Sequence, residues 1–315
     1  MNSLISIIIP TYNSSAYILD TLNNVFAQSY TNIEVIVVDN NSTDDTEILL
    51  QNYINDKSII YLKQPKKGAS AARNLGLQHA NGNYIQFLDA DDLLHANKLK
   101  LQIELMEAKA LDICYCSWSF FEDTIIKNDR YKNTMFYDYV ISGRDMIKSF
   151  GMSNFYMPLH CWLTKASIIK KSGYWNEAIT NNDDGEFFTR VLLQSQRIFG
   201  IQQVLCYYRR VAHSLSAMNS GERIDSAFKS YSIIENLLKA EQDRRLLSYV
   251  KRMYYVQFTS LYYTYPKMAK RAATAFDKIK APCFLHKRCR FWWLIRCFGL
   301  FDAYKINNKL NKLLQ

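Results

Sequence analysis

The sequence of 315 residues lacks the features that mark several large protein classes. Its 10 glycines never form the G-x-G-x-x-G or G-x-x-x-x-G-K-[ST] patterns, so it holds neither a dinucleotide fingerprint nor a P-loop. No stretch reaches the roughly 18 apolar residues that a membrane span needs. The seven cysteines are odd in number and form no C-x-x-C pair, which favours reduced thiols over a disulfide framework. No secretory leader pattern opens the chain, so we expect a cytoplasmic protein.

The composition is that of a globular protein with an uneven distribution of charge. Hydrophobic residues make up 49% and charged residues 22%, which excludes intrinsic disorder. The net charge is +10, yet residues 1–220 hold 20 basic and 22 acidic side chains, whereas residues 221–315 hold 19 and 7. The basic excess therefore lies in the last third of the chain, which argues against a uniformly basic nucleic-acid coat.

Apolar, β-branched runs alternate with helix-like segments in the first hundred residues. Strands are predicted at Ile5–Ile9, Glu34–Val38, Ile59–Leu62 and Tyr84–Leu88. Helices are predicted at Ser15–Gln28, Thr43–Tyr53, Ser70–Ala80 and Asn97–Ala108. This repeat is the βαβ pattern, so we expect an α/β fold of Rossmann-like type with a mainly parallel central sheet covered by helices on both faces.

Polar clusters follow three of these strands, and parallel sheets bind ligands at the carboxyl ends of their strands. Pro10, Thr11 and Tyr12 follow the first strand, and Asp39 follows the second. Residues 89–92 (DADD) follow the fourth. We therefore expect the binding site at this edge of the sheet.

The three carboxylates of the DADD segment would repel one another unless a cation lay between them. A hard divalent ion with oxygen ligands, Mg²⁺ or Mn²⁺, is the natural candidate. The alternative is that Asp91 or Asp92 caps the next helix and the other carboxylates are solvated.

Asp39 can accept hydrogen bonds from a base N–H or a ribose hydroxyl beside Thr11. Ser42 or Thr43, a few residues later, can cap the following helix. In the segment KKGASAARN, Lys66, Lys67 and Arg73 are candidates for neutralising phosphates, although a Lys-Lys pair alone is usually a solvated loop.

Six stretches together resemble the inverting glycosyltransferases of family 2, which have the GT-A fold. The matching segments are SIIIPTYN (6–13), EVIVVDNNSTD (34–44), GASAARNLGL (68–77), YIQFLDADD (84–92), NDDGEF (182–187) and YRRVAHSLS (208–216). They span about two thirds of the chain in the family's order. Many relatives have Asp-Asp-Gly where this chain has Asp39, Asn40 and Asn41.

The resemblance assigns roles to the residues that match the family's motifs. It implies that Thr11 and Asp39 hold a uridine base and that Arg73 lies near the nucleotide. We expect Pro10 and Tyr12, from the same segment as Thr11, to belong to the donor site.

The family's metal site implies a second group of residues. Asp89 is expected near the ribose and the metal, and Asp91 is expected to ligate a divalent cation, Mn²⁺ or Mg²⁺. His213 resembles a family histidine that reaches the metal or the diphosphate, although a lone loop histidine is more often a surface or packing residue.

The later acidic cluster would supply the catalytic base. By position, Asp184 matches the carboxylate that receives the proton of the acceptor hydroxyl, and its neighbour Asp183 is the other candidate. The same segment also reads as the N-cap and first turn of a helix, where acids are favourable to the helix dipole. Both roles are compatible.

The resemblance implies three functional regions. Residues 1–110 would form the nucleotide-sugar-binding half of the GT-A domain, residues 111–220 the acceptor-binding half with the base, and residues 221–315 a basic, aromatic, helical extension. The mixture of aromatic and basic residues in that extension suits the anionic surface of a membrane, with no nucleic acid expected. The alternative is that its aromatic faces pack on the body and its cations face water.

The predicted function is transfer of a sugar, with inversion, from a nucleotide diphosphate sugar, UDP-linked by family habit, to a saccharide or lipid-linked saccharide. Such an enzyme would act in the synthesis of cell-surface polysaccharide or glycolipid, at the inner face of the cytoplasmic membrane. A non-catalytic scaffold that binds a nucleotide sugar at the membrane is the alternative.

Overall fold

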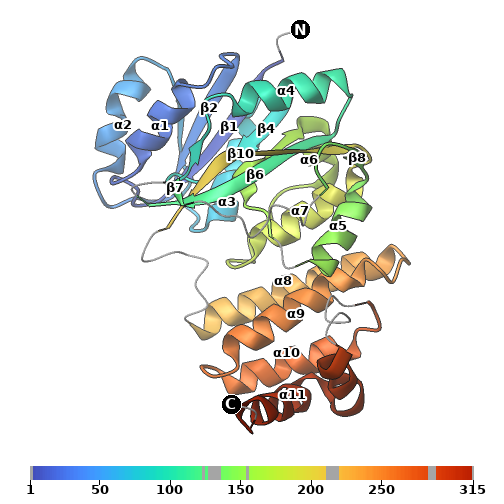
Figure 1. Ribbon diagram of the computed structural model, residues 1–315. Coiled ribbons are helices and arrows are strands. Elements are labelled where there is room, and N and C mark those ends of the chain that lie inside the picture. Colours follow the sequence, from blue (N-terminus) through green and yellow to red (C-terminus); the bar gives the residue numbers. More distant parts are fainter. Residues whose placement is uncertain are drawn as a thin grey trace. The chain divides into compact units, whose positions relative to one another are not determined.

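The predicted strands and helices of the first hundred residues all form (Figure 1). The computed structural model describes residues 3–122, 125–126, 136–153, 156–210, 220–282 and 289–313. The first four main strands are β1 (Ile5–Thr11), β2 (Ile33–Asp39), β3 (Ile60–Lys63) and β4 (Tyr84–Phe87). The helices between and after them are α1 (Ile18–Phe26), α2 (Thr46–Asn55), α3 (Ala69–His79) and α4 (Lys98–Ala108).

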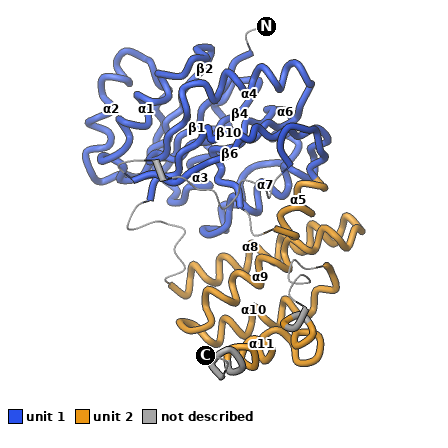
Figure 2. Tube along the Cα trace, in the orientation of Figure 1, with its two compact units in different colours: residues 1–143, 156–219 blue, residues 144–155, 220–315 orange. Residues whose placement is uncertain are grey.

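The chain divides into two compact units (Figure 2). The first contains residues 1–143 and 156–219, and the second contains residues 144–155 and 220–315. The second unit is thus built from two separate stretches of the chain. The region predicted for residues 1–110 lies within the first unit. The region predicted for residues 111–220 is divided, because its residues 144–155 and 220 belong to the second unit, and the roles of both regions stay predictions.

The remaining elements of the first unit extend the sheet and cover it. They are β5 (Leu93–Leu94), β6 (Ile113–Phe121), β7 (Ile125–Ile126), β8 (Val140–Ile141), a short 3₁₀ helix η2 (Leu159–Cys161), β9 (Trp162–Lys165), α6 (Ala166–Ser172), α7 (Asp183–Gln194) and β10 (Ile198–Arg209).

The sheet has the strand order β3-β2-β1-β4-β9-β6-β10-β5. Strands β3, β2, β1 and β4 are mutually parallel, and β6 is parallel to β10. Strand β9 lies antiparallel between β4 and β6, so the sheet is mixed but mostly parallel. The predicted α/β class with helices flanking the sheet is confirmed.

Burial explains why these segments are strands. Ile5, Ile7, Ile8 and Ile9 of β1 are all fully buried, as expected for a central parallel strand with both faces covered. Helix α3 packs against β1 and β2, and α4 packs against β6, on opposite faces of the sheet (Figure 1). The Cβ of an alanine at Gly76 would lie 2.5 Å from a methyl carbon of Ile8, so α3 approaches β1 closely.

Two helix caps differ from the sequence-based alternatives. Helix α4 begins at Lys98 after an N-cap at Asn97, so neither Asp91 nor Asp92 caps it. Helix α2 begins at Thr46 with Asp45 at the N-cap, so the expected capping by Ser42 or Thr43 is wrong. The polar segments after β2 and β4 are each longer than a simple cap, which leaves their carboxylates available for other contacts.

The second unit is helical. It contains α5 (Gly143–Met152) from Arg144 onward, α8 (Gly221–Ala240), α9 (Leu247–Leu261), α10 (Pro266–Lys278) and α11 (Cys289–Leu313). A left-handed residue at Gly299 interrupts α11. No helix in the described part of the chain is long and apolar enough to cross a membrane.

Aromatic side chains build much of the core of this helical unit. Phe258 is fully buried and its ring contacts those of Tyr262, Phe301 and Tyr304.

Ion pairs and close packing join α5 to the later helices of the unit: the guanidinium of Arg144 pairs with Glu241.

Other aromatic side chains of the unit face solvent. The exposed fractions are 78% for Tyr263, 61% for Trp293 and 52% for Phe298. The aromatic residues of the basic C-terminal region therefore serve partly as core and partly as surface.

Candidate functional site

The ends of β1 and β2 bring two of the predicted donor-site residues together. Thr11 and Asp39 are paired in the register of the parallel ladder, and Asp39 is paired in turn with Lys63 of β3. Both Thr11 and Asp39 are buried. The sheet edge thus presents a hydroxyl and a carboxylate side by side, as the sequence predicted.

The hydrogen bonds of Asp39 fix its carboxylate. Its Oδ1 accepts bonds from the backbone N and the Oγ of Ser42, at 3.1 and 2.5 Å. Burial and the charge of Asp39 raise the pKa of the Tyr61 hydroxyl on the neighbouring strand β3, so that phenol stays protonated. Among the described residues, the hydroxyl oxygen of Thr11 is buried without a hydrogen-bond partner, and that of Tyr61 is buried beside the carboxylate of Asp39. Such polar atoms are available to a ligand.

Asn40 explains why this chain departs from the Asp-Asp-Gly of many relatives. Its Nδ2 donates to the carbonyl oxygens of Gln64 and Lys66, at 2.9 and 2.7 Å. Its Oδ1 accepts from the backbone N of Gly68 at 2.7 Å. Gly68 is the N-cap of α3 with φ of 126°, a conformation that favours glycine. An amide can make all three bonds, whereas a carboxylate could not donate, so Asn40 clamps the loop before α3.

Arg73 joins the DADD segment to the later acidic cluster. Its Nη2 lies 2.9 Å from Oδ1 of Asp89, and its Nη1 lies 2.9 Å from Oδ2 of Asp183. The arginine is 5% exposed. Burial opposes its charge, but the charges of Asp89 and Asp183 outweigh this effect and raise the pKa of the guanidinium. Sequence positions 73, 89 and 183 therefore meet at one place.

An aromatic platform holds Arg73 in position. The guanidinium lies over the ring of Trp175, 4.6 Å from its centroid, and that ring stacks on Phe187 of α7 at 4.1 Å. Asn74, the neighbour of Arg73, exchanges two hydrogen bonds with the backbone of Trp175, at 2.8 and 3.0 Å. Helix α3 and the segment before α7 are thereby fixed to each other.

The two candidate bases open helix α7. Asp183 is engaged by Arg73 and also accepts a bond from the Oγ of Ser70 at 3.1 Å. The side chain of Asp184 accepts only from the backbone N of Gly185, at 2.8 Å, among the contacts of the described residues. Burial, followed by repulsion from Asp183, raises the pKa of Asp184 to about 6. Of the two carboxylates, Asp184 is the one less committed to structure, and its raised pKa suits a general base.

The DADD segment has a buried support behind it. Both carboxylate oxygens of Asp92 face inward: Oδ1 accepts from the backbone N of Arg209 at 2.8 Å, and Oδ2 lies 2.8 Å from Nδ1 of His160. The Nε of Arg209 donates to the backbone oxygen of Asp91 at 2.8 Å. From α1, the hydroxyl of Thr21 donates to the backbone oxygens of residues 90 and 92. Strand β10, helix η2 and helix α1 therefore hold the segment rigidly.

Asp91 has the electrostatic character of a cation ligand. Burial and then the charges of Asp92 and Asp89 raise the pKa of its carboxyl to about 7. Arg73 engages Oδ1 of Asp89, and within the part of the chain that the structure describes the other oxygen of that carboxylate forms no ion pair. Two carboxylates that repel each other at a strand end fit a hard divalent cation, which would relieve the repulsion.

Several predicted residues have other surroundings. Tyr12 is 53% exposed, and Pro10, opposite Val38 in the ladder of β1 and β2, is partly buried. The amine of Lys66 pairs with Glu177 at 2.6 Å, which favours the structural interpretation of the Lys-Lys pair. His213 lies outside the described residues.

Sequence reasoning missed the support residues His160, Trp175 and Arg209. Local periodicity does not mark them, and their partners are 12 to more than 100 residues away in the chain. The one available signal was Arg209 within the segment YRRVAHSLS, which carried part of the family resemblance.

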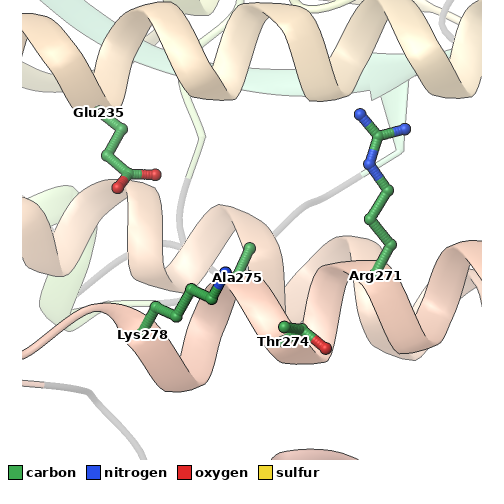
Figure 3. Close-up of a pocket in the computed structure, with 5 residues that line it drawn as sticks. All are labelled: Glu235, Arg271, Thr274, Ala275 and Lys278. Atoms are coloured by element: carbon green, nitrogen blue, oxygen red, sulfur yellow. The ribbon is translucent and has the colours of Figure 1, made fainter.

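A separate pocket lies within the helical unit (Figure 3). Glu235 of α8 lines it together with Arg271, Thr274, Ala275 and Lys278 of α10. Two of its three charged residues already have ion-pair partners: Arg271 pairs with Asp225 at 2.8 Å, and Glu235 pairs with Lys239 at 2.6 Å. The strand-end cluster of the first unit is the stronger candidate site, because it holds buried polar atoms, such as the Thr11 hydroxyl, that have no partner among the described residues.

Comparison with solved structures supports the fold. The chain matches the Staphylococcus aureus TarS 1–349 structure in complex with UDP-GlcNAc with a TM-score of 0.74 and 20% identity, over 99% of this chain and 92% of that one. It matches the mannosyltransferase PcManGT from Pyrobaculum calidifontis, in complex with GDP-Man and Mn²⁺, with a TM-score of 0.56 and 16% identity, over 99% and 88% of the two chains. The match to TarS confirms the GT-A fold that the sequence predicted.

Sequence comparison finds curated relatives over part of the chain. WfaP of Escherichia coli, a UDP-Glc:alpha-D-GlcNAc-diphosphoundecaprenol beta-1,3-glucosyltransferase, is 41% identical over 124 residues, which are 39% of this chain and 49% of WfaP. The glycosyltransferase GlyA of Streptococcus pneumoniae is 28% identical over 221 residues, which are 67% of this chain and 31% of GlyA. The chain spans about half the length of these relatives or less.

A family model matches more than half of the chain. The model is that of glycosyl transferase family 2, and the match covers residues 6–173, from β1 through α6. This span includes the ends of β1, β2 and β4. It also includes Arg73, which contacts Asp89 after β4 and Asp183 of α7. The chain belongs to glycosyl transferase family 2.

Proposed function

We propose that this protein transfers a sugar from a UDP-sugar to a lipid-linked saccharide, with inversion, during the synthesis of a cell-surface polysaccharide. The observation that carries the proposal is the contact of Arg73 with both Asp89 and Asp183. Through it, the donor-side carboxylates at the end of β4 and the candidate base at the start of α7 share one site. Direct transfer of a sugar requires that the bound donor and the base acting on the acceptor hydroxyl lie close together.

The proposed donor site lies at the ends of β1 and β2. The carboxylate of Asp39 would accept the N–H of uracil, and the buried hydroxyls of Thr11 and Tyr61 would offer further hydrogen bonds. The UDP-GlcNAc complex of TarS and the UDP-Glc named for WfaP support a UDP-sugar. Residues 1–110 would then form the donor half of the domain and residues 111–220 the acceptor half.

Asp91 and Asp89 would hold a divalent cation, Mn²⁺ or Mg²⁺. The Mn²⁺ in the PcManGT complex and the raised pKa of Asp91 support this assignment. A cation bound there would stabilise the negative charge that develops on the departing nucleotide diphosphate. His213 is proposed as a further contact of the metal or diphosphate.

Asp184 is proposed as the general base. Its carboxylate would take the proton of the acceptor hydroxyl while that oxygen attacks the anomeric carbon. The C–O bond to the sugar forms as the bond to the diphosphate breaks, so the anomeric configuration inverts. Arg73 holds Asp183 beside it, which keeps the first turn of α7 in place.

The acceptor is proposed to be lipid-linked because the name of WfaP specifies a diphosphoundecaprenol acceptor. The helical unit would bring the enzyme to the cytoplasmic face of the membrane. Exposed Trp293 and Phe298 flank exposed Arg296 on α11, a combination that suits the headgroup region of an anionic bilayer.

The transfer reaction can be tested with a panel of UDP-sugars and a synthetic diphospholipid-linked N-acetylhexosamine. We expect UDP release that requires both the acceptor and Mn²⁺ or Mg²⁺, and an NMR spectrum of the product with the anomeric configuration opposite to that of the donor. Asp91→Asn should abolish the metal-dependent reaction, whereas Glu104→Gln, an exposed acid on α4, should leave it unchanged. Donor binding without UDP release under every condition would favour the scaffold instead.

Membrane attachment can be tested by sedimentation with vesicles of phosphatidylglycerol and phosphatidylcholine. Each lysine near an anionic surface contributes about 1 kcal/mol to binding. The variant with Lys267, Lys270 and Lys278 of α10 changed to Gln should therefore bind at least tenfold more weakly. The same change at Lys57, Lys100 and Lys171, exposed lysines of the first unit, is the control. Equal, salt-insensitive sedimentation of both variants would contradict the proposal.

A further inference from the structure

Three cysteine side chains converge in the interior of the first unit, away from the strand ends. Cys116 lies in the middle of β6, Cys161 ends helix η2 directly before β9, and Cys206 lies on β10. Strands β9, β6 and β10 are neighbours in the sheet, so three adjacent elements each contribute one thiol. We call these three residues the thiol cluster.

The spacing of the sulfur atoms matches that of ligands around one metal ion. All three lie within 4.8 Å of one another, and Sγ of Cys116 is 3.5 Å from Sγ of Cys206. Zinc–sulfur bonds of about 2.3 Å in tetrahedral geometry place neighbouring sulfurs about 3.8 Å apart. The cluster therefore needs little rearrangement to bind a thiophilic ion.

Oxygen atoms adjoin the same space. The backbone oxygen of His160 lies 3.2 Å from Sγ of Cys206, and that of Cys161 lies 3.7 Å from Sγ of Cys116. These carbonyl groups could complete a fourth coordination position, because structural zinc sites have four ligands.

A buried lysine lies near the thiol cluster without a carboxylate partner. Lys98 is fully buried, and its amine donates to the side-chain oxygens of Gln86 and Gln102, at 2.5 and 2.6 Å. Among the described residues it forms no ion pair. A buried ammonium group with only neutral partners is costly unless an anion lies nearby.

The charge of Lys98 acts on the thiols. Burial opposes ionisation of all three, and the pKa values of Cys161 and Cys206 are raised. Burial is outweighed at Cys116 by hydrogen bonds from the other two thiols and by Lys98, and its pKa is lowered. The surroundings thus already favour one thiolate.

We propose that Cys116, Cys161 and Cys206 form a structural binding site for one thiophilic divalent cation, with zinc as the ion of matching charge and geometry. Three thiolates and one divalent ion leave one negative charge, which the ammonium group of Lys98 neutralises. Binding converts the thiols to thiolates and releases their protons to solvent. The site is distinct from the carboxylates of Asp89 and Asp91, which prefer a hard cation.

The burial of the thiol cluster determines how it must be tested. All three cysteines are fully buried, so the ion would enter while the chain folds rather than by diffusion into the folded protein. The full-length protein is therefore unfolded in denaturant with a chelator, freed of metal, and refolded with Co²⁺ or Zn²⁺. Cobalt is the probe because thiolate ligands give it an intense charge-transfer absorption.

We expect refolding with Co²⁺ to give one thiolate-bound cobalt per chain, and Zn²⁺ to abolish that absorption when added before refolding. The variant Cys116→Ser or Cys206→Ser should lose the charge-transfer band. The matched controls are Cys114→Ser, a buried cysteine on the same strand but outside the cluster, and Cys297→Ser, an exposed one. Asp91→Asn should keep the band, which separates this site from the proposed catalytic cation.

The absence of a thiolate–cobalt band from refolded wild-type protein, together with less than one zinc per ten chains as expressed, would overturn the proposal. This readout needs only the wild-type chain, so it decides the matter even if a cysteine variant fails to fold. It is also independent of glycosyl transfer: a chain with no transferase activity can still show the band, and an active chain can lack it.

Discussion

The Nη1 atom of Arg73 on α3 lies 2.9 Å from the carboxylate of Asp183 at the start of α7. The contact joins residues 110 positions apart in the chain and spans the two regions that the sequence assigns to donor and acceptor. It also leaves Asp184, the next residue, with fewer structural commitments. This difference in contacts between two adjacent carboxylates is the ground on which we propose Asp184, rather than Asp183, as the base.

Replacing Arg73 by Met should lower the free energy of unfolding by about 3 kcal/mol, because the carboxylates of Asp89 and Asp183 lose a partner in a mostly buried site. Urea denaturation measures the change. Lys63→Met, which removes the solvent-exposed pair with Glu47, is the control and should cost less than about 1 kcal/mol. Equal losses of unfolding free energy for the two variants would mean that the Arg73 contacts stabilise the protein no more than a solvent-exposed ion pair.

Asp184→Asn should lower the rate of sugar transfer by about 10²- to 10⁴-fold, which is the usual contribution of a general base. Donor affinity, measured by calorimetry with the UDP-sugar and Mn²⁺, should change little, because the proposed role of Asp184 is to act on the acceptor hydroxyl and not on the donor. Asp183→Asn should instead weaken donor binding through Arg73. If Asp183→Asn gave the purely catalytic defect and Asp184→Asn retained turnover, the assignment of the base would have to be reversed.

The pH dependence of transfer should follow the ionisation of Asp184. Its pKa of about 6 reflects burial and the charges of Asp183 and Asp89, opposed by Arg73. A base must be ionised to act. At a saturating concentration of Mn²⁺, which would keep Asp91 ionised, kcat/KM should therefore fall about tenfold per pH unit below pH 6 and level off above it.

The same group should affect stability in the opposite sense. Since the folded carboxyl has a higher pKa than its ordinary value of 3.8, ionisation destabilises the folded state. Asp184→Asn should therefore melt at a higher temperature than the wild type above pH 6, with the difference disappearing near pH 4. A constant difference across that range would contradict the assigned pKa.

Asn40→Asp should destabilise the protein, although Asp occupies this position in many relatives. The new carboxylate oxygen would face the carbonyl oxygens of Gln64 and Lys66 and lose two hydrogen bonds, at a cost of about 2 kcal/mol. Urea denaturation at neutral pH tests this. Asn52→Asp, an exposed position on α2, is the control and should change the unfolding free energy by less than about 0.5 kcal/mol.

The sequence predicts the parallel half of the sheet because local signals are strong there. Residues 5–9 (ISIII) and 34–38 (EVIVV) are each β-branched and apolar at four of five positions, and each is followed by a polar cluster that marks the end of the strand. Register then brings Thr11 and Asp39 together without further information. The GT-A fold and the family membership follow from these motifs in their order.

The support of the site could not be predicted in this way. The Nδ1 of His160 meets Asp92 only because β9 and β10 are inserted beside β4 and β6, an order set by long-range pairing rather than by local periodicity. The capping role given to Ser42 failed for a related reason, because a hydroxyl that can cap a helix can also bond the carboxylate before it. Local patterns identify which groups are present, and tertiary pairing decides which of them meet.

Helix α5 has a consequence for biosynthesis. It is made before β9, α7 and β10, yet the compact unit to which it belongs is completed only by residues 220–315. A nascent chain that has reached residue 219 therefore carries a helix whose partners, such as Glu241, have not been translated. Truncations that remove the basic C-terminal region would leave the same helix without its packing partners. Point substitutions on the surface of the C-terminal region therefore separate membrane binding from folding better than truncations do.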